Sequence, residues 1–237
     1  MDFTHSYEAV LPEDVRARYE IRETRNAAAI FKATNPDLFD ELVSSLNSFE
    51  IEADDLLLAG GQESTLARRF NDAFRSLGWR EARVDTDIEL KLKIMPYKPA
   101  GERVVRERST PVSNKGYKVD NFKGRVALDL EWNAKDGNLD RDIGAYRALY
   151  DAGFIDLGII VTRTQDELRA FATQLRLSHG MEEREAKKML ATTTTTNLEK
   201  LMPRLTRGDA GGCPILAIAI CSRTFENAIT QTGARLS

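Results

Sequence analysis

One predicted strand, residues 126–133, carries three side chains that could bind a divalent metal ion. Successive side chains of a strand point to opposite faces, so Asp129, Glu131 and Asn133 share one face and apolar residues share the other. Polar groups are costly to bury without partners, and a hard cation such as Mg²⁺, which takes oxygen ligands, would satisfy them. The alternative is an amphipathic edge strand whose polar face lies in water, and the strand alone leaves both interpretations open.

Two features beside this strand favour the metal site. Asp120 lies in a turn-like segment, residues 119–125, and a hairpin there would bring its carboxylate alongside Glu131. The strand also leads directly into a predicted helix, whose N-terminus is a natural site for a phosphate. Because a cation compensates the repulsion between neighbouring carboxylates, we expect Asp120 and Glu131 to share one metal site.

The elements around these residues alternate between helices and strands. Apolar residues recur at helical spacing in some segments, whereas other segments alternate or are continuously apolar, as strands are. This succession predicts an α/β fold in which a mixed β-sheet is flanked by helices, with a mainly helical N-terminal portion. One predicted helix begins at Asn35-Pro36, and four others cover about 64–77, 138–152, 165–177 and 182–190. The predicted strands cover 85–94, 126–133, 155–161 and 214–221.

Three further segments carry specific expectations. Strict alternation in residues 85–94 predicts a half-buried strand with its apolar side chains on the covered face. Residues 96–118 hold six lysines and arginines against two glutamates, and their prolines and glycines predict mostly loop. This basic segment is either a solvated excursion or an arm that lies along phosphates. Asp140 and Asp142 are interpreted as acids that stabilise the positive end of the predicted helix 138–152.

The order and spacing of these motifs resemble the PD-(D/E)XK nucleases, and among them the type II restriction endonucleases of the BglII and BamHI kind. Residues 120–125 resemble the Asp-Phe-Gly-Lys-Arg turn of that family, and residues 131–133 resemble its Glu-Val-Gln. Glu81 is similar to a glutamate that serves the metal site in the family. The resemblance covers about residues 78–163, with a longer gap between the two acids and with Asn133 in place of the longer glutamine.

The resemblance implies a type II restriction endonuclease that hydrolyses DNA at a short palindromic double-stranded site. Asp120 and Glu131 would hold one or two Mg²⁺ ions, with Glu81 and Asp129 as further candidate ligands. The metal would lower the pKa of a water molecule and neutralise charge on the leaving oxygen. Asn133 would orient that water, since a carboxamide cannot act as a base. The alternatives are a structure-specific or repair nuclease on the same fold and a DNA-binding protein that does not cleave.

The same resemblance implies that double-stranded DNA is the partner and that the enzyme is a homodimer, each subunit cutting one strand. In the loop after the active strand, Asp136 could accept a hydrogen bond from cytosine, and Lys135 could reach guanine or a phosphate. The alternative for the basic side chains is an ordinary solvated surface. The candidate DNA contacts are Lys135, Asp136, Asn138, Lys115, Lys118, Lys123, Arg204, Arg207 and Arg223.

Length and composition set the remaining limits. The 237 residues suffice for a single endonuclease domain over 1–237, in which 1–78 is mainly helical, 79–163 is the catalytic core and 164–237 supplies helices, a DNA-contacting loop and a final strand. The net charge of −3 does not exclude DNA binding, which depends on how charge is arranged.

The chain has two histidines and two cysteines. These low counts argue against Ser-His or Cys-His catalysis, a histidine-rich zinc site and a disulfide framework. The start of the chain lacks the apolar core of an export signal, and no apolar run reaches the length of a membrane span. We therefore expect a cytoplasmic protein with no membrane partner.

Overall fold

A computed structural model describes residues 1–58 and 64–225 and divides the chain into two compact units. The larger unit joins Met1–Ala82 to Val119–Ser237, and the smaller unit is Arg83–Lys118. Whether both units work as one endonuclease domain stays a prediction. None of the helices in the described part of the chain is long and apolar enough to cross a bilayer.

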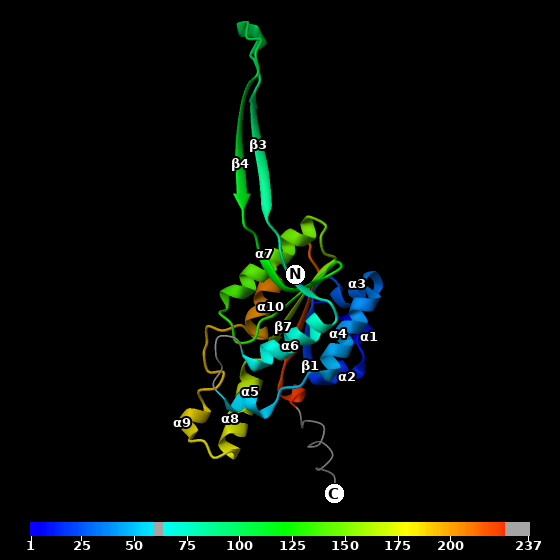
Figure 1. Cartoon of the computed structure of the whole chain (residues 1–237), viewed down its shortest axis with the longest axis vertical. Helices are drawn as coiled ribbons and strands as arrows, with labels where there is room; N and C mark the ends of the chain where they lie inside the picture. The colour runs from blue at the N-terminus through cyan, green and yellow to red at the C-terminus, as the bar shows by residue number, and fades with distance from the viewer. Residues whose placement is uncertain (59–63, 226–237) are drawn as a thin grey trace. The chain divides into compact units, whose positions relative to one another are not determined.

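A six-stranded mixed sheet in the order β1-β8-β7-β6-β5-β2 is the centre of the larger unit (Figure 1). β6, β7 and β8 run parallel, whereas β1 pairs antiparallel with β8 and β5 pairs antiparallel with β6. This architecture confirms the predicted α/β fold with a mixed sheet. The strands are β1 (Tyr19–Glu23), β2 (Arg80–Arg83), β5 (Lys118–Lys123), β6 (Val126–Leu130), β7 (Leu157–Arg163) and β8 (Ile215–Ile220).

Helices flank this sheet, and the segment before β2 is mainly helical, as predicted. The predicted helices 64–77, 138–152 and 165–177 correspond to α6, α7 and α8, but the predicted helix 182–190 is confined to α9, because the chain passes into turns that end at the left-handed Leu190. The helices are α1 (Tyr7–Val10), α2 (Glu13–Arg18), α3 (Ala27–Thr34), α4 (Pro36–Ser48), α5 (Ala53–Leu57), α6 (Thr65–Ser76), α7 (Gly137–Asp151), α8 (Asp166–Ser178), α9 (Glu183–Ala186) and α10 (Leu198–Arg207), with the 3₁₀ turn η2 (Ser222–Thr224) after β8.

The two faces of the sheet have different coverings. Leu128 of β6 and Ile159 of β7 belong to the same buried core as Leu42 of α4. Because side chains alternate along a strand, the opposite face of β6 presents Asp129. On that face the hydroxyl of Tyr146, from α7, reaches Asp129, so α7 covers the side of the sheet from which the candidate acids project.

β6 ends at Leu130, so the predicted strand through Asn133 was too long. Glu131 still donates its N–H to the carbonyl of Val161, at 2.8 Å, but Asn133 has a φ of 55°, in the left-handed region. That conformation turns the chain out of the extended form. The prediction that Asn133 shares a strand face with Asp129 and Glu131 was therefore wrong.

The smaller unit is an antiparallel hairpin of β3 (Thr86–Ile94) and β4 (Arg106–Asn114), with the 3₁₀ turn η1 (Lys98–Ala100) between them (Figure 1). β4 lies inside the basic segment that was predicted to be mostly loop, and that prediction was wrong because every β4 residue finds a partner in β3. The strand 85–94 was predicted correctly, but not its burial. A hairpin has no second layer over either face. The four alternating apolar residues Ile88, Leu90, Leu92 and Ile94 are 41–59% exposed.

Candidate active site

A cleft of about 470 Å³ opens just beyond the carboxyl end of β6. Its lining includes Asp120 of β5, Glu131 and Asn133 from the loop after β6, and Asn138 and Arg141 from the first turns of α7. α6 contributes further polar residues to the wall. The fold therefore gathers the three predicted catalytic side chains around one cavity at the start of a helix.

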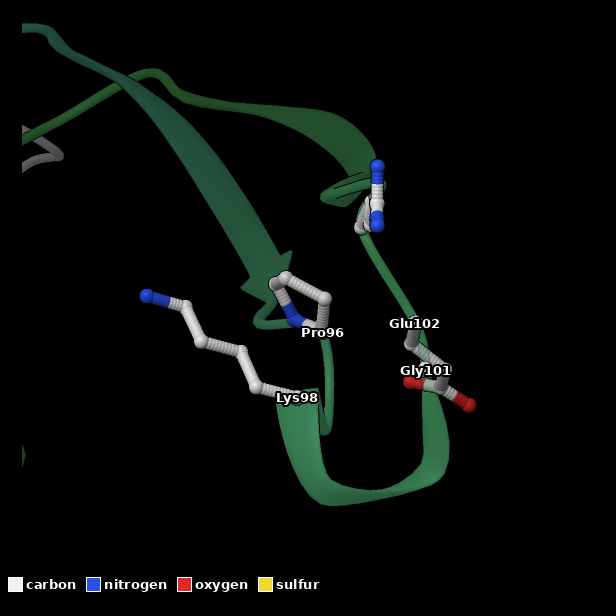
Figure 2. A pocket seen from close by; sticks show the side chains of 5 residues that line it. Pro96, Lys98, Gly101 and Glu102 are labelled. Atoms are coloured by element: carbon white, nitrogen blue, oxygen red, sulfur yellow. The ribbon is translucent and has the colours of Figure 1, made fainter.

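A second hollow lies in the smaller unit and is lined by Pro96, Lys98, Gly101, Glu102 and Arg103 (Figure 2). Its charged side chains do not converge, since Lys98 and Glu102 point away from each other in Figure 2. The cleft beyond β6 is therefore the better candidate for chemistry.

Hydrogen bonds fix both the N–H and the carbonyl group of Glu131. Its N–H donates to the carbonyl of Val161 at 2.8 Å. Its own carbonyl accepts from the hydroxyls of Thr162, at 3.0 Å, and Thr196, at 2.9 Å. Both threonines are fully buried. Sequence reasoning missed these contacts, which fix the point from which the Glu131 side chain enters the cleft.

The Glu131 carboxyl group is almost enclosed. The residue is 4% exposed, and apart from the carboxyl group of Asp142 its Oε2 has no hydrogen-bond partner among the described residues. Burial, followed by the neighbouring Asp142 carboxylate, raises the pKa of Glu131 to about 9. A positive charge at this point would reverse that effect, because it would favour the ionised form.

Asp129 is engaged by its neighbours through both oxygens. The N–H of Asp120 donates to Oδ1 at 2.7 Å, and the hydroxyl of Tyr146 lies 2.6 Å from Oδ2. The same hydroxyl lies 2.8 Å from the carbonyl oxygen of Ile159. A hydroxyl carries one proton, so both contacts are satisfied when a protonated Asp129 donates to Tyr146. Burial raises the pKa of Asp129 to about 8, which agrees with that arrangement.

Asp120 and Glu81 lie on the neighbouring strands β5 and β2. Asp120 is half-buried and lines the cleft, and burial and then the charge of Asp142 raise its pKa. The carboxylate of Glu81 acts in the same direction on Asp120, so the two acids are close enough to interact. Glu81 itself is exposed at the edge of the sheet. The roles of Asp120, Glu81 and Asp129 as metal ligands stay predictions.

Asp142 is the acidic residue whose importance the sequence reasoning missed. Interpreted there as a helix-end acid, it is instead 1% exposed, and its charge raises the pKa of Glu131, Asp129 and Asp120. Asp140 does lie at the surface, paired with Arg204. The available signal was helical spacing, because position 142 falls on the buried stripe of α7.

These residues fit a hard divalent cation. Within residues 1–58 and 64–225, no three acidic, histidine or cysteine side chains stand close enough to hold a metal ion by themselves. Mg²⁺ does not need such a cage, since it keeps several waters and is usually bound by one or two carboxylates with substrate phosphates. Glu131 Oε2 and Asp142 Oδ2 are buried oxygens that no group of the described residues satisfies apart from each other, and a cation would satisfy them in place of a proton.

Comparison with known proteins identifies the family of the chain. The family model described as restriction endonuclease BglII/BglIII matches residues 19–220, from the first residue of β1 to the last of β8. The chain belongs to the BglII family of restriction endonucleases. No curated protein matches it. Membership makes the protein a type II restriction endonuclease, a site-specific deoxyribonuclease that acts on DNA, in a family that generally uses a divalent metal.

Several side chains predicted to contact DNA are bound within the endonuclease itself. Lys123 donates to Glu41 Oε1 and to the carbonyl of Leu77, both at 2.6 Å. Arg204 forms a two-pronged pair with Asp140, at 2.7 and 2.9 Å. A phosphate would have to replace these bonds, so the DNA contacts of Lys123 and Arg204 stay predictions.

The remaining candidates differ in how they are placed. Asn138 lines the cleft, and Lys135 is exposed next to Ala134, which also lines it. Asp136 accepts a hydrogen bond from Lys200 at 3.2 Å. Their DNA contacts, too, are untested predictions. Of the others, Arg207 pairs with Asp209, Arg223 donates to the carbonyl of Ala17, and Lys115 and Lys118 belong to the smaller unit.

We expect the metal-free endonuclease to lose stability as the pH rises. The pKa values of Glu131 and Asp129 are raised to about 9 and about 8, largely by burial. A group whose pKa is higher in the folded protein stabilises the fold fully below its unfolded pKa, about 4 for carboxyl groups, and loses that contribution as the pH passes its folded pKa. The thermal midpoint in a chelator should therefore fall between about pH 5 and about pH 9.

Glu131→Gln removes one of these groups and serves as the comparison. Its thermal midpoint should fall less over the same pH range, and Mg²⁺ should reduce the fall in the unmodified protein. Identical pH profiles for the two proteins would contradict the assignment of a protonated, buried Glu131.

Proposed function

We propose that this restriction endonuclease hydrolyses double-stranded DNA in a Mg²⁺-dependent reaction at a short palindromic site and acts as a homodimer. The observation that carries the proposal is the meeting of Asp120 and Glu131 in one cleft at the start of α7. Hydrolysis of a phosphodiester needs an activated water and relief of charge on the leaving oxygen. Two carboxylates beside a helix N-terminus suit a metal ion and a phosphate together.

Asp120 and Glu131 are the proposed metal ligands. When bound, the cation lowers the pKa of a water molecule and stabilises developing negative charge. The bond from the N–H of Asp120 to Asp129 fixes the backbone position of Asp120. The carbonyl and hydroxyl groups around the peptide group of Glu131 fix the backbone position of Glu131. Such rigid support keeps reacting groups in position without a reorganisation cost during the reaction.

Asn133 is proposed to orient the attacking water. Its left-handed backbone turns it out of β6, and its side chain lines the cleft with Glu131. A carboxamide donates and accepts hydrogen bonds but takes up no proton at neutral pH. Asn133 therefore orients rather than deprotonates, and no side chain of the cleft needs to act as a covalent nucleophile.

The homodimer follows from the geometry of the substrate. Each chain contributes one such cleft, whereas a double-strand break requires a cut in each of two antiparallel strands. Two identical subunits related by a two-fold axis match a sequence that reads the same on both strands. We propose that the recognised site is palindromic for this reason.

Digestion of plasmid and phage DNA tests the proposal. With Mg²⁺ we expect discrete fragments whose sequenced ends define one palindromic site, and with a chelator we expect intact DNA. Light scattering of the purified protein should give the mass of a dimer. A smear or nicks without sequence preference would favour a structure-specific nuclease, and retarded but uncut DNA would favour a non-cleaving binder; either result contradicts the proposal.

A further inference from the structure

Asp142 faces Glu131 from the second turn of α7, where the two carboxyl groups lie close enough to share a hydrogen bond. Apart from that shared contact, the buried oxygens Glu131 Oε2 and Asp142 Oδ2 have no hydrogen-bond partner in the part of the chain that the structure describes. Asp142 is 1% exposed and Glu131 is 4% exposed. Water therefore has little access to either oxygen, and an unpaired buried acceptor is costly.

Arg141 contacts only the other oxygen of each carboxyl group. Its Nε and Nη2 lie 3.1 and 3.0 Å from Asp142 Oδ1. The same Nη2 reaches to within 3.8 Å of Glu131 Oε1. The guanidinium thus contacts one oxygen of each carboxyl group and not the opposite two oxygens.

We propose that Asp142 is a positioning residue of the metal site, which holds the Glu131 carboxyl group by direct contact and adds a second buried negative charge for the cation or its bound water. The proposal rests on the proposed function, because it assumes that Glu131 is a metal ligand. It differs from that function in assigning a role to a residue of α7 that does not line the cleft. Carboxylates behind a metal ligand orient it and raise cation affinity.

A purely structural role for Asp142 would predict a different effect on the thermal midpoint. A buried acid that only stabilised the fold would lower stability when neutralised, whether or not metal was present. In the proposed arrangement Asp142 acts mainly on the metal-bound protein, because it holds the Glu131 carboxyl group for the cation. Asp142→Asn, which keeps a hydrogen-bonding side chain of the same shape, should therefore change the thermal midpoint of the metal-free protein less than it reduces the rise produced by metal.

Binding of Mn²⁺ alone to the full chain without DNA provides the direct test. Mn²⁺ accepts the same oxygen ligands as Mg²⁺, and its unbound fraction is measured by electron paramagnetic resonance. We expect Asp142→Asn to weaken Mn²⁺ binding about 10- to 100-fold. Asp140→Asn, which neutralises an exposed acid two positions earlier on the same helix, should bind like the unmodified protein.

Arg141→Gln gives an independent variant in case Asp142→Asn does not fold. Arg141 is exposed, and its removal takes a positive charge away from both carboxyl groups. We expect Mn²⁺ to bind several-fold more tightly, whereas Arg147→Gln, at an exposed ion pair of the same helix, should have no effect. Unchanged or weaker binding by Arg141→Gln would overturn the proposal.

The outcomes separate this inference from the proposed function. If the unmodified protein binds Mn²⁺, Glu131→Gln abolishes binding and Asp142→Asn leaves it unchanged, the role of Asp142 is overturned and the metal site stands. If Mn²⁺ binding is equally tight in the unmodified protein and in Glu131→Gln, the proposed function itself is contradicted.

Discussion

Glu131→Gln is expected to lower the rate of DNA cleavage by about 10³-fold or more, because a metal ion in such a site contributes several kcal/mol to the transition state. The substitution replaces a carboxylate oxygen by a neutral amide of nearly the same shape. The peptide group of Glu131 keeps its bonds to Val161, Thr162 and Thr196. Only the charge offered to the cation changes.

The fold should survive this change. Burial raises the pKa of Glu131 to about 9, so the metal-free protein holds it neutral below that pH, and glutamine is a neutral replacement of nearly the same shape. Single-turnover cleavage of a fragment that contains the mapped site measures the rate, and circular dichroism measures the thermal midpoint without metal. Asp140→Asn is the matched control. Cleavage by Glu131→Gln within tenfold of the unmodified rate would remove Glu131 from the site.

Gly158→Ala is expected to destabilise the endonuclease by about 3 kcal/mol, at the upper end of the cost of overpacking a core. A Cβ at Gly158 would lie 2.1 Å from Cδ2 of Tyr146, so the ring must move. Tyr146 is fully buried, and its hydroxyl contacts Asp129 and the carbonyl of Ile159. The methyl group therefore disturbs the contact that holds Asp129.

That displacement should also reach the active site. Asp129 accepts the N–H of Asp120, so a shifted Tyr146 loosens the strand that carries a proposed metal ligand. We expect cleavage to fall about tenfold or more, since a misplacement of about 1 Å can cost 10²-fold in rate. The loss of activity would be a consequence of position, because Gly158 itself carries no chemistry.

Urea unfolding measures the stability of Gly158→Ala through a lower midpoint with an unchanged slope. Gly144→Ala is the matched control, because this glycine lies inside α7 and an added Cβ would meet no atom within 4 Å. Alanine there should stabilise the protein by about 0.5–1 kcal/mol. Equal stability of the two variants would contradict the role assigned to the contact between Gly158 and Tyr146.

Local patterns in the sequence determined the main elements and the candidate acids. Residues 126–130 alternate, residues 155–161 are nearly all apolar, and the segments that follow each strand have helical spacing. The spacing of apolar residues alone therefore predicted β6, β7, α7 and α8. Asp120 and Glu131 were predictable for the same reason, since a turn and a strand of known direction place two acids together. Family resemblance pointed to the same residues and to the same chemistry.

Tertiary structure alone decided what surrounds those acids. The burial of Asp142 depends on which side of α7 packs against the sheet, and the bonds of Thr196 to Glu131 join residues far apart in the chain. The exposure of Leu90 depends on β3 having only β4 beside it. Sequence determined which side chains could bind a metal, because type and spacing are local. Packing decided which carboxyl groups are desolvated, because desolvation depends on every neighbouring element.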